Sequence, residues 1–586
     1  MINMKHAVQD AVHTAIRKAA DKRGIAADSL DLSQVILSLP PSSDLGDLAF
    51  PMFSLARSFR VAPAVIAQSV ADELTQDSCI WIDSADAAGP YVNVRLLRSQ
   101  YIQQIAQALS TEPELFGRTS RYAGVNVMVE FSCPNTNKPL HLGHLRNNAL
   151  GAGVSRLFAA AGAEVRRVNL INDRGVHICK SMLAYKKFGR GETPESLGMK
   201  PDHFVGSYYV RFAQWAKEDP SAEKQAIEML QQWEAGDPEV IELWTRMNSW
   251  AITGINETYE RTNIEFDQVY YESETYLSGR DEILKGLEKE IFYRAEDGAV
   301  MVDLTDIGLD TKVLLRSDGT SLYLTQDIGT AIARHKDWPF ERMVYVVGSE
   351  QQYHFRVLFH VLEKLGFPWA RNLFHLSYGM VNLPEGKMKS REGTVVDADD
   401  LLAKLTELAL SELRERGREE TVDDPAATAH AIALGALHYY LLMVTPNKDM
   451  IFDPAESLSF NGNTGPYLQY VGARISSMIR KAGFDTAQAA SADFTLLTLD
   501  AEWDIVKLIG RFPEIIERSA EGYAPSELAG YLYDLGKEFS RYYHETPVFQ
   551  GVSRELAHAR LALCRFVLTV MKQGFEILGI PFLEKM

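Results

Sequence analysis

The sequence contains few cysteines, and their spacing does not pair them. Only four occur in 586 residues, and no two of them form a Cys-x-x-Cys pair. They are Cys79, Cys133, Cys179 and Cys564. A disulfide framework or a structural zinc site needs clustered cysteines, so this pattern argues against both.

Long hydrophobic runs are also lacking. The longest nearly apolar stretch, residues 432–444, contains His438 and is shorter than the roughly 20 residues that a membrane-spanning helix needs. No apolar segment near the first residue has the form of a signal peptide. We therefore expect a cytoplasmic protein that makes no membrane contact.

The sequence has no excess of basic residues. Lys and Arg number 60 against 78 Asp and Glu, which gives a formal net charge of −18. Phosphate contacts need clustered Lys and Arg, so this balance argues against a general nucleic-acid-binding protein. Local basic patches can still hold a large RNA, and the motifs must decide that question.

The remaining composition is that of an ordinary globular protein. Hydrophobic residues make up 46% of the chain and charged residues 24%. A chain of 586 residues exceeds what one hydrophobic core normally supports, so we expect three domains.

One segment combines a strand, a loop bracketed by two prolines, and the start of a helix. Residues 125–131 form a short β-rich apolar run, and a helix is predicted from about His141. His141 and His144 then share one face of the first turn, where free amides and the helix dipole favour anions. Gly143 lacks the side chain that would keep a base or phosphate away from the backbone. Two histidines at this spacing also occur on ordinary helix surfaces, but the preceding strand favours a nucleotide site.

The residues around this motif make it more specific. Asn135 and Lys138 precede the histidines, and residues 164–173 follow as a second predicted strand. The pattern Asn-x-x-Lys-Pro-x-His-x-Gly-His resembles the class I aminoacyl-tRNA synthetases, and specifically the arginyl-tRNA synthetases. The resemblance covers nearly the whole chain, and its signals occur in the family's order. It implies an α/β fold, in which a Rossmann-type catalytic domain carries a small N-terminal α/β domain and a C-terminal all-α helix bundle.

The resemblance and the local patterns together define three expected domains. Residues 1–113 resemble the N-terminal domain that touches the outer corner of the tRNA. Residues 114–424 form the Rossmann-type catalytic domain, with a helical insertion at about 188–262. Residues 425–586 resemble the helical anticodon-binding domain.

Local patterns predict individual elements within these domains. The first domain is predicted to contain a helix over residues 4–22 and strands over residues 28–39 and 91–96. In the catalytic domain, Asn172 or Asp173 is predicted to cap the next helix, with a simple turn as the alternative.

The second half of the catalytic domain holds the candidate amino-acid pocket. Residues 266–273 are predicted as a strand that reaches Glu272, and residues 322–327 as a strand that turns into a helix. A guanidinium presents five donors in a fixed fork, so a selective site needs carboxylates and an aromatic cover. Glu272, Asp327 and Tyr323 meet that description. Most Asp and Glu are solvated surface groups, but both segments match positions where the family binds arginine.

The resemblance adds two residues to this pocket. Gln351, at the end of a predicted strand over residues 343–352, matches the family's pocket glutamine. Asn135 is placed to hold the α-amino or carboxylate group of the substrate. His354, one helical turn further along, is interpreted as a helix residue rather than an ATP contact.

Residues 383–393 resemble the mobile Lys-Met-Ser-Lys-Ser loop of class I synthetases, whose lysines neutralise charge on the departing pyrophosphate. Aligned from Lys387, the second lysine position is Ser390. Lys389 lies one position before Ser390 and Arg391 one position after it. Which of the two acts in place of the second lysine stays open.

Many arginyl enzymes lack that second lysine, and the lysine before the first histidine is thought to substitute for it. Lys138 occupies this place. The resemblance therefore implies catalytic roles for His141, His144, Lys138 and Lys387. It implies ATP contacts from His141, Gly143, His144, Lys138, Met388 and Lys389.

From about residue 425 the pattern becomes almost entirely helical. Helices are predicted over residues 426–443, 466–482, 496–511, 525–545 and 553–578.

Several residues are candidate contacts to tRNA. Tyr467, Gln469, Tyr470 and Arg474 lie where the chain resembles the anticodon-binding domain and can stack on or hydrogen-bond splayed bases. Tyrosines at this spacing also occur in helix cores. Asn93 is a candidate contact to the tRNA corner, and an asparagine that satisfies a turn is the alternative.

The resemblance implies an arginine–tRNA ligase. Its substrates would be L-arginine, ATP carried with Mg²⁺, and arginine tRNA, with no tightly bound protein metal and a monomer as the expected state. Two alternatives stay open. A different nucleotidyl transferase would share the histidine motif without the terminal additions. A non-catalytic tRNA-binding paralogue would keep those additions and lose the chemistry.

Overall fold

The computed structural model describes residues 2–75, 79–276, 279–320, 322–384, 396–484, 489 and 491–586. Contacts divide the chain into two compact units. Unit 1 comprises Met1–Phe116, Ile475–Pro513 and Leu535–Val570, and unit 2 comprises Gly117–Arg474, Glu514–Asp534 and Met571–Met586. None of the described helices combines the length and the apolar character that a membrane crossing requires.

The centre of unit 2 is a five-stranded parallel sheet. Its strand order is β11 (Leu373–Tyr378), β10 (Arg342–Gly348), β4 (Asn126–Glu130), β5 (Glu164–Ile171) and β6 (Gln268–Tyr271). The central β4 is nearly all buried, as expected for a parallel strand covered on both faces. The strand order confirms a Rossmann-type sheet. From β4 the chain adds β5 and β6 on one side and later β10 and β11 on the other, so the order changes direction between β4 and β10. Ligands of such sheets bind at this switch point, beyond the carboxyl ends of the strands.

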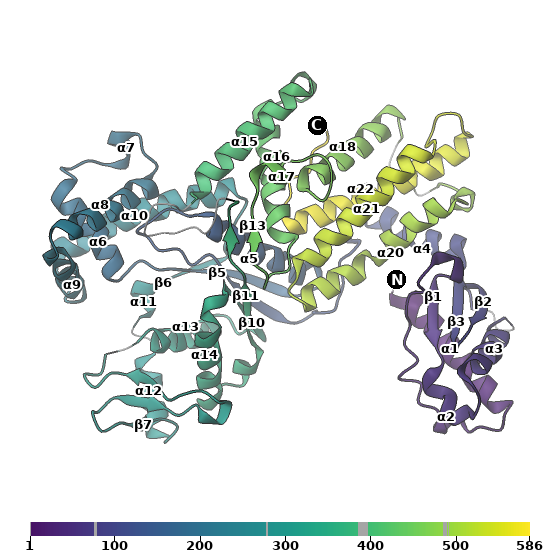
Figure 1. The fold of residues 1–586 in the computed structure, drawn as a ribbon, viewed down its shortest axis with the longest axis horizontal. Coiled ribbons are helices and arrows are strands. Elements are labelled where there is room, and N and C mark those ends of the chain that lie inside the picture. Colours follow the sequence, from purple (N-terminus) through teal and green to yellow (C-terminus); the bar gives the residue numbers. More distant parts are fainter. Residues whose placement is uncertain are drawn as a thin grey trace. The chain divides into compact units, whose positions relative to one another are not determined.

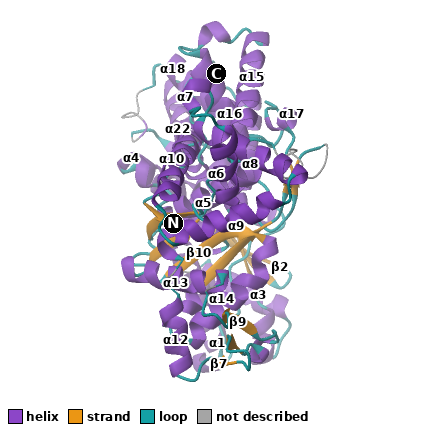
Figure 2. Cartoon of the chain, turned by 90° about the vertical axis from the view of Figure 1, so that its left-hand side faces the viewer, coloured by secondary structure: helices purple, strands orange, loops and turns teal. Residues whose placement is uncertain are grey.

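Helices cover both faces of this sheet. Helix α5 (Leu142–Ala160) packs on β4, β5 and β10, and α16 (Pro425–Leu442) packs on α5. Helices α13 (Tyr323–Asp337) and α14 (Gln352–Lys364) lie on the opposite side of the sheet (Figures 1 and 2). The crevice at the switch point is therefore bordered by the start of α5 and by the loops that follow β5, β6 and β10.

A helical insertion with its own core follows β5. The residues predicted as the insertion form α8 (Pro201–Glu218), α9 (Ser221–Glu234) and α10 (Pro238–Arg261), and the preceding α6 (Val176–Phe188) packs into the same core. Smaller elements follow β6: α11 (Glu272–Thr275), α12 (Arg280–Glu288) and an antiparallel sheet of β7 (Tyr293–Arg294), β8 (Val300–Val302) and β9 (Lys312–Leu315). Helix α12 and this sheet share a core with α13 and α14. Helix α15 (Ala398–Glu415) packs against α16.

Unit 1 contains an antiparallel sheet in the order β1 (Leu48–Pro51), β3 (Tyr91–Leu96) and β2 (Ile82–Ala88). Helix α3 (Pro63–Leu74) packs on β2 and β3, and α1 (Ile2–Asp21) packs on α3. The predicted helix over residues 4–22 and strand over residues 91–96 are confirmed. The Asp47 carboxylate accepts hydrogen bonds from the Trp503 indole at 2.8 Å and from the Leu96 amide at 2.9 Å.

The C-terminal part of the chain is helical, as predicted. The helices are α18 (Gly465–Lys481), α20 (Asp500–Glu521), α21 (Pro525–Glu545) and α22 (Arg554–Leu578). Helix α20 starts four residues later than predicted and continues through Pro513, where a stop was expected.

Two predicted strands are wrong. Residues 28–39 contain a short 3-10 helix and one isolated bridge between Ser38 and Ala49. The Asp31 carboxylate accepts a hydrogen bond from the Ser33 amide, a local turn that competes with strand pairing. Residues 322–327 instead form the start of α13. The Leu322 amide donates a hydrogen bond to the Thr325 hydroxyl at 3.4 Å, and the buried side chains recur at helical spacing.

The predicted cap of the helix after β5 is also wrong. Helix α6 starts after Gly175, which makes no side-chain cap. The Asp173 carboxylate instead accepts hydrogen bonds from the Ser273 amide at 2.8 Å and the Ser273 hydroxyl at 2.7 Å. It therefore ties β5 to the segment after β6.

Candidate active site

The start of α5 holds two histidines in contact. His141 is the N-cap, and its Nδ1 accepts a hydrogen bond from the Gly143 amide at 3.1 Å. His144 Nδ1 accepts from the His141 amide at 3.1 Å, and the ring centroids lie 3.9 Å apart. The helix start predicted at His141 is confirmed. Each imidazole closes one free amide of the first turn.

Gly143 is required by the histidines themselves. A Cβ at this position would lie 2.9 Å from Cε1 of the His141 ring. The sequence suggested room for a ligand as the reason for this glycine. The structure adds a second reason, which is that a larger residue at this position would push the His141 ring away.

Both imidazoles are neutral at physiological pH. Burial, together with the nearby Lys138 ammonium, lowers the pKa of His141 to about 4. Burial and the charges of His141 and Lys138 hold the pKa of His144 well below its ordinary value. Because Nδ1 accepts a hydrogen bond in each ring, the proton resides on Nε2. The site therefore offers two neutral Nε2–H donors, and burial also lowers the pKa of the nearby Lys138.

The loop between β4 and α5 is held in an unusual backbone conformation. Ser132 and Cys133 have φ angles of 74° and 47°. The Ser132 amide donates to the Asn147 side chain at 2.5 Å, and the Cys133 amide to the Asn169 side chain at 3.0 Å. Burial raises the pKa of the Cys133 thiol, so it remains protonated and is no nucleophile.

The same loop is tied to the end of β5. Asn172 donates from its amide to Pro134 at 2.9 Å and accepts from the Thr136 amide at 3.2 Å, and it forms an isolated bridge with Asn135. These contacts fix the loop that carries the half-buried Asn135 and Lys138 and leads into the two histidines.

A second chain segment runs beside the first histidine. The Leu142 amide donates to the Val396 carbonyl at 3.0 Å, and the Ala398 amide donates to the Leu140 carbonyl at 3.0 Å. Val396 is the first described residue after 384. The predicted loop residues Lys387, Met388, Lys389 and Arg391 lie outside the described residues.

Carboxylates gather at the ends of β5 and β6. Glu272 begins α11 directly after β6, and Asp327 lies in the second turn of α13. Burial raises the pKa of Glu272 to about 7; Arg174 opposes the shift, while Asp173 and Asp327 add to it. The negative charges of Glu272 and Asp327 therefore lie close enough to repel each other.

Three residues near these carboxylates were not among the pocket residues predicted from the sequence. Asp173, a predicted helix cap, and the following Arg174 lie in the turn before α6. The Arg174 guanidinium lies 3.9 Å from the Tyr276 ring centroid and 2.6 Å from Glu234. His354 is a helix residue, but its Nε2 also lies 2.6 Å from the Asp327 carboxylate. Only the pairing of α13 with α14 brings these two together.

Tyr323 and Gln351 stand at the edge of the site. Tyr323 starts α13 with 78% of its surface exposed, and Gln351 is exposed in the turn after β10. Neither covers a closed pocket in this structure.

Two candidate tRNA contacts are buried in the fold. The Gln469 amide donates to the Ala431 carbonyl at 3.0 Å and the Pro581 carbonyl at 2.8 Å, and its side chain is fully buried. Asn93 is buried in β3. Burial favours a packing role for both residues, so we do not include them in the proposed tRNA contacts. Arg474 and Tyr470 remain partly exposed, with the Arg474 guanidinium donating to the Tyr470 hydroxyl at 2.7 Å.

Three protein families match successive parts of the chain. Residues 4–96 match the arginyl tRNA synthetase N terminal domain, residues 104–453 the catalytic domain of tRNA synthetases class I (R), and residues 468–586 the DALR anticodon binding domain. The catalytic family alone spans more than half of the sequence.

Relatives match over nearly their full length. The arginine–tRNA ligase of Treponema denticola is 55% identical, covering 96% of this chain and 97% of its own. That of Treponema pallidum is 50% identical, covering 98% of each chain. The solved Thermus thermophilus arginyl-tRNA synthetase has a TM-score of 0.79 and 27% identity over 99% of this chain and 100% of its own.

These matches agree with the paired histidines at the switch point of a Rossmann-type sheet. The chain belongs to the arginyl-tRNA synthetase family of class I tRNA synthetases.

Proposed function

We propose that this enzyme joins L-arginine to ATP as arginyl-adenylate and then transfers arginine to the 3′-terminal adenosine of arginine tRNA. The observation that carries the proposal is the pair of neutral, touching imidazoles of His141 and His144 at the start of α5. The proposed division of labour is tRNA-corner binding by residues 1–113, catalysis by 114–424 and anticodon binding by 425–586. The full-length relatives support the ligase over a non-catalytic paralogue.

In the first step, an arginine carboxylate oxygen bonds to the α-phosphorus of ATP, and the bond to the bridging β-phosphate oxygen breaks. Pyrophosphate leaves with that electron pair, so no enzyme nucleophile is needed. Catalysis is then positioning and charge stabilisation. His141 and His144 donate from Nε2, Gly143 leaves room for ATP beside the two rings, and Lys138 neutralises phosphate charge.

The loop around Lys387 completes this part of the proposal. Lys387 acts on the phosphates with Lys138, and Met388 and Lys389 contact ATP. Mg²⁺ arrives bound to the ATP phosphates, because it favours phosphate oxygens and water over an all-protein cage.

The arginine side chain is bound by carboxylates. Glu272 and Asp327 pair with the guanidinium, while Tyr323 and Gln351 cover it from the edge of the site. Asn135 holds the α-amino or carboxylate group. A lysine ammonium would leave these carboxylates partly unpaired, which accounts for selectivity.

In the second step, the ribose 2′-hydroxyl of the terminal adenosine attacks the adenylate carbonyl and displaces AMP. Tyr467, Tyr470 and Arg474 contact anticodon bases, since aromatic and guanidinium groups stack on unpaired bases. We propose that the enzyme acts as a monomer in the cytoplasm, where tRNA is charged for translation.

The test is exchange of labelled pyrophosphate into ATP, run with each amino acid and with or without arginine tRNA. Exchange that depends on arginine supports the proposal. Exchange with another amino acid would keep the class I chemistry and overturn the pocket. Bound tRNA without any exchange would favour the non-catalytic paralogue.

A further inference from the structure

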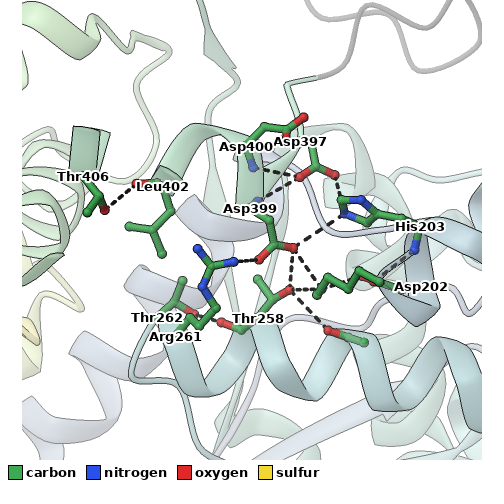
Figure 3. Close-up of polar contacts among 12 residues, drawn as sticks. Asp202, His203, Thr258, Arg261, Thr262, Asp397, Asp399, Asp400, Leu402 and Thr406 are labelled. Carbon is green, nitrogen blue, oxygen red and sulfur yellow. Dashed lines mark hydrogen bonds and ion pairs between the residues drawn. The ribbon is translucent and has the colours of Figure 1, made fainter. Parts of the chain in front are cut away.

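A cluster of six charged side chains joins the helical insertion to the start of α15 (Figure 3). We call it the charge clamp. It comprises the cations Lys200, His203 and Arg261 and the carboxylates Asp202, Asp397 and Asp399. No role in the arginyl or ATP chemistry proposed above uses these residues.

The contacts at Asp399 are close and largely buried. One carboxylate oxygen lies 2.9 Å from the Lys200 ammonium, and the other lies 2.6 Å from the Arg261 guanidinium. Lys200 also lies 3.0 Å from Asp202, whose side chain is fully buried. A buried carboxylate needs such partners, since removing one leaves an uncompensated charge.

Asp397 has two separate tasks in the clamp. One oxygen accepts from the Asp399 and Asp400 amides at 2.9 and 3.1 Å and so caps α15. The other oxygen lies 3.1 Å from Nε2 of His203 on α8. The carboxylates of Asp397, at 3.1 Å from the ring, and Asp399, at 3.7 Å, raise the pKa of His203 to about 10, so the ring is a cation at neutral pH.

The clamped segment is the one that runs beside the ATP-site histidines. Backbone hydrogen bonds join Leu142 to Val396 and Ala398 to Leu140, and His141 lies opposite Asp397 between them. A movement of Asp397 would therefore shift the backbone on which the His141 ring is mounted.

We propose that His203, Lys200 and Arg261 are positioning residues for the ATP site. Through Asp397 and Asp399 they fix the position of the ATP site relative to the helical insertion. The inference rests on the proposed ATP role of His141. It assigns a function to the insertion: its α8 and α10 fix the segment that aligns the α5 histidines.

A protein cation already occupies the carboxylates of the clamp. Asp202, His203 and Asp399 could together hold a metal ion. The Lys200 ammonium, however, already lies within 3.0 Å of both carboxylates that such an ion would need. The charges are balanced by protein cations alone.

The test compares His203→Gln with His360→Gln in the full chain. His360 on α14, a helix outside the clamp, also pairs with a carboxylate, Asp306, at 3.1 Å. We expect His203→Gln to weaken arginine-dependent pyrophosphate exchange about tenfold, through kcat or the KM for ATP. The KM for arginine should stay within about twofold. His203→Lys, which restores the cation, should recover most of the loss.

Three comparisons decide the outcome. Equal exchange by the His203→Gln and His360→Gln proteins would overturn the inference. So would a lower melting temperature with unchanged kcat and KM for ATP, because a merely structural residue would give that result. If His203→Gln does not fold, Arg261→Gln tests the more exposed edge of the clamp. We expect Arg261→Gln to weaken pyrophosphate exchange by about threefold, a smaller loss of the same kind. Unchanged exchange in the Arg261→Gln protein would overturn the inference.

His141→Ala, measured in parallel, separates this inference from the proposed function. Loss of exchange in His141→Ala with normal exchange in His203→Gln overturns the clamp alone. Normal exchange in His141→Ala overturns the ATP role on which the clamp rests.

Discussion

Nε2 of His354 lies 2.6 Å from the carboxylate of Asp327, and the two residues come from neighbouring helices, α14 and α13. The contact orients one oxygen of Asp327, and in the proposed function the other oxygen pairs with the substrate guanidinium. It also makes His354 the residue that sets the direction of the proposed pocket carboxylate.

Asp327→Ala should therefore raise the KM for arginine steeply, by roughly 100-fold, while the KM for ATP changes little. The reason is that the guanidinium loses a charged partner in a partly buried site. Steady-state exchange kinetics with each substrate varied in turn would measure both constants. Asp306→Ala is the matched control, because it removes the carboxylate from the similar His360 contact. Equal losses for arginine and ATP would contradict the assignment of Asp327 to the amino-acid pocket.

Arginine binding should weaken as the pH falls through 7. The pKa of Glu272 is raised to about 7, so the group is increasingly protonated below this value and loses its attraction for a guanidinium. Above pH 7 it is ionised and the KM for arginine should level off. Measuring this KM from about pH 6 to pH 8.5 tests the expectation. Glu272→Gln should have a high KM that no longer varies over this range, and an unchanged pH profile in that variant would refute the role of Glu272.

Gly143→Ala should lower the rate of arginine activation about 100-fold with little loss of stability. The added methyl would meet the His141 ring at 2.9 Å and displace the imidazole from the amide that it caps. Pyrophosphate exchange and thermal unfolding would be measured together. Gly530→Ala is the control, since a Cβ there meets nothing within 4 Å. A Gly143→Ala enzyme with normal exchange would mean that the ring position does not matter for catalysis.

Arg146→Met should destabilise unit 2 by about 3 to 5 kcal/mol. Arg146 is fully buried on α5, and its guanidinium donates to the carbonyls of Gly379, Met380, Pro446 and Lys448 at 2.7 to 3.2 Å. Loss of these donors leaves buried carbonyls with fewer partners. Chemical denaturation followed by fluorescence would measure the change. Arg118→Met on the surface should stay within about 0.5 kcal/mol of the parent protein.

The sequence was most informative where structure depends on near neighbours. The apolar run over residues 125–131 predicted β4, and helical spacing after His141 predicted α5. Failures arose where a local signal was ambiguous. Residues 322–327 carry an apolar run that suits a strand, but Thr325 and the buried face of α13 make it a helix. Asp173 has a capping residue's identity and position, yet its carboxylate bonds to Ser273, which lies 100 residues away.

The site divides in the same way. The order of motifs along the chain determined the family, the α/β class and the paired histidines, because each motif is a short segment whose spacing carries its chemistry. Only the tertiary structure decided that His354 orients Asp327, that Gln469 is buried, and that a charge clamp from the insertion holds the segment beside His141. Those contacts join residues far apart in sequence. They depend on how helices pack on the sheet, which local periodicity does not specify.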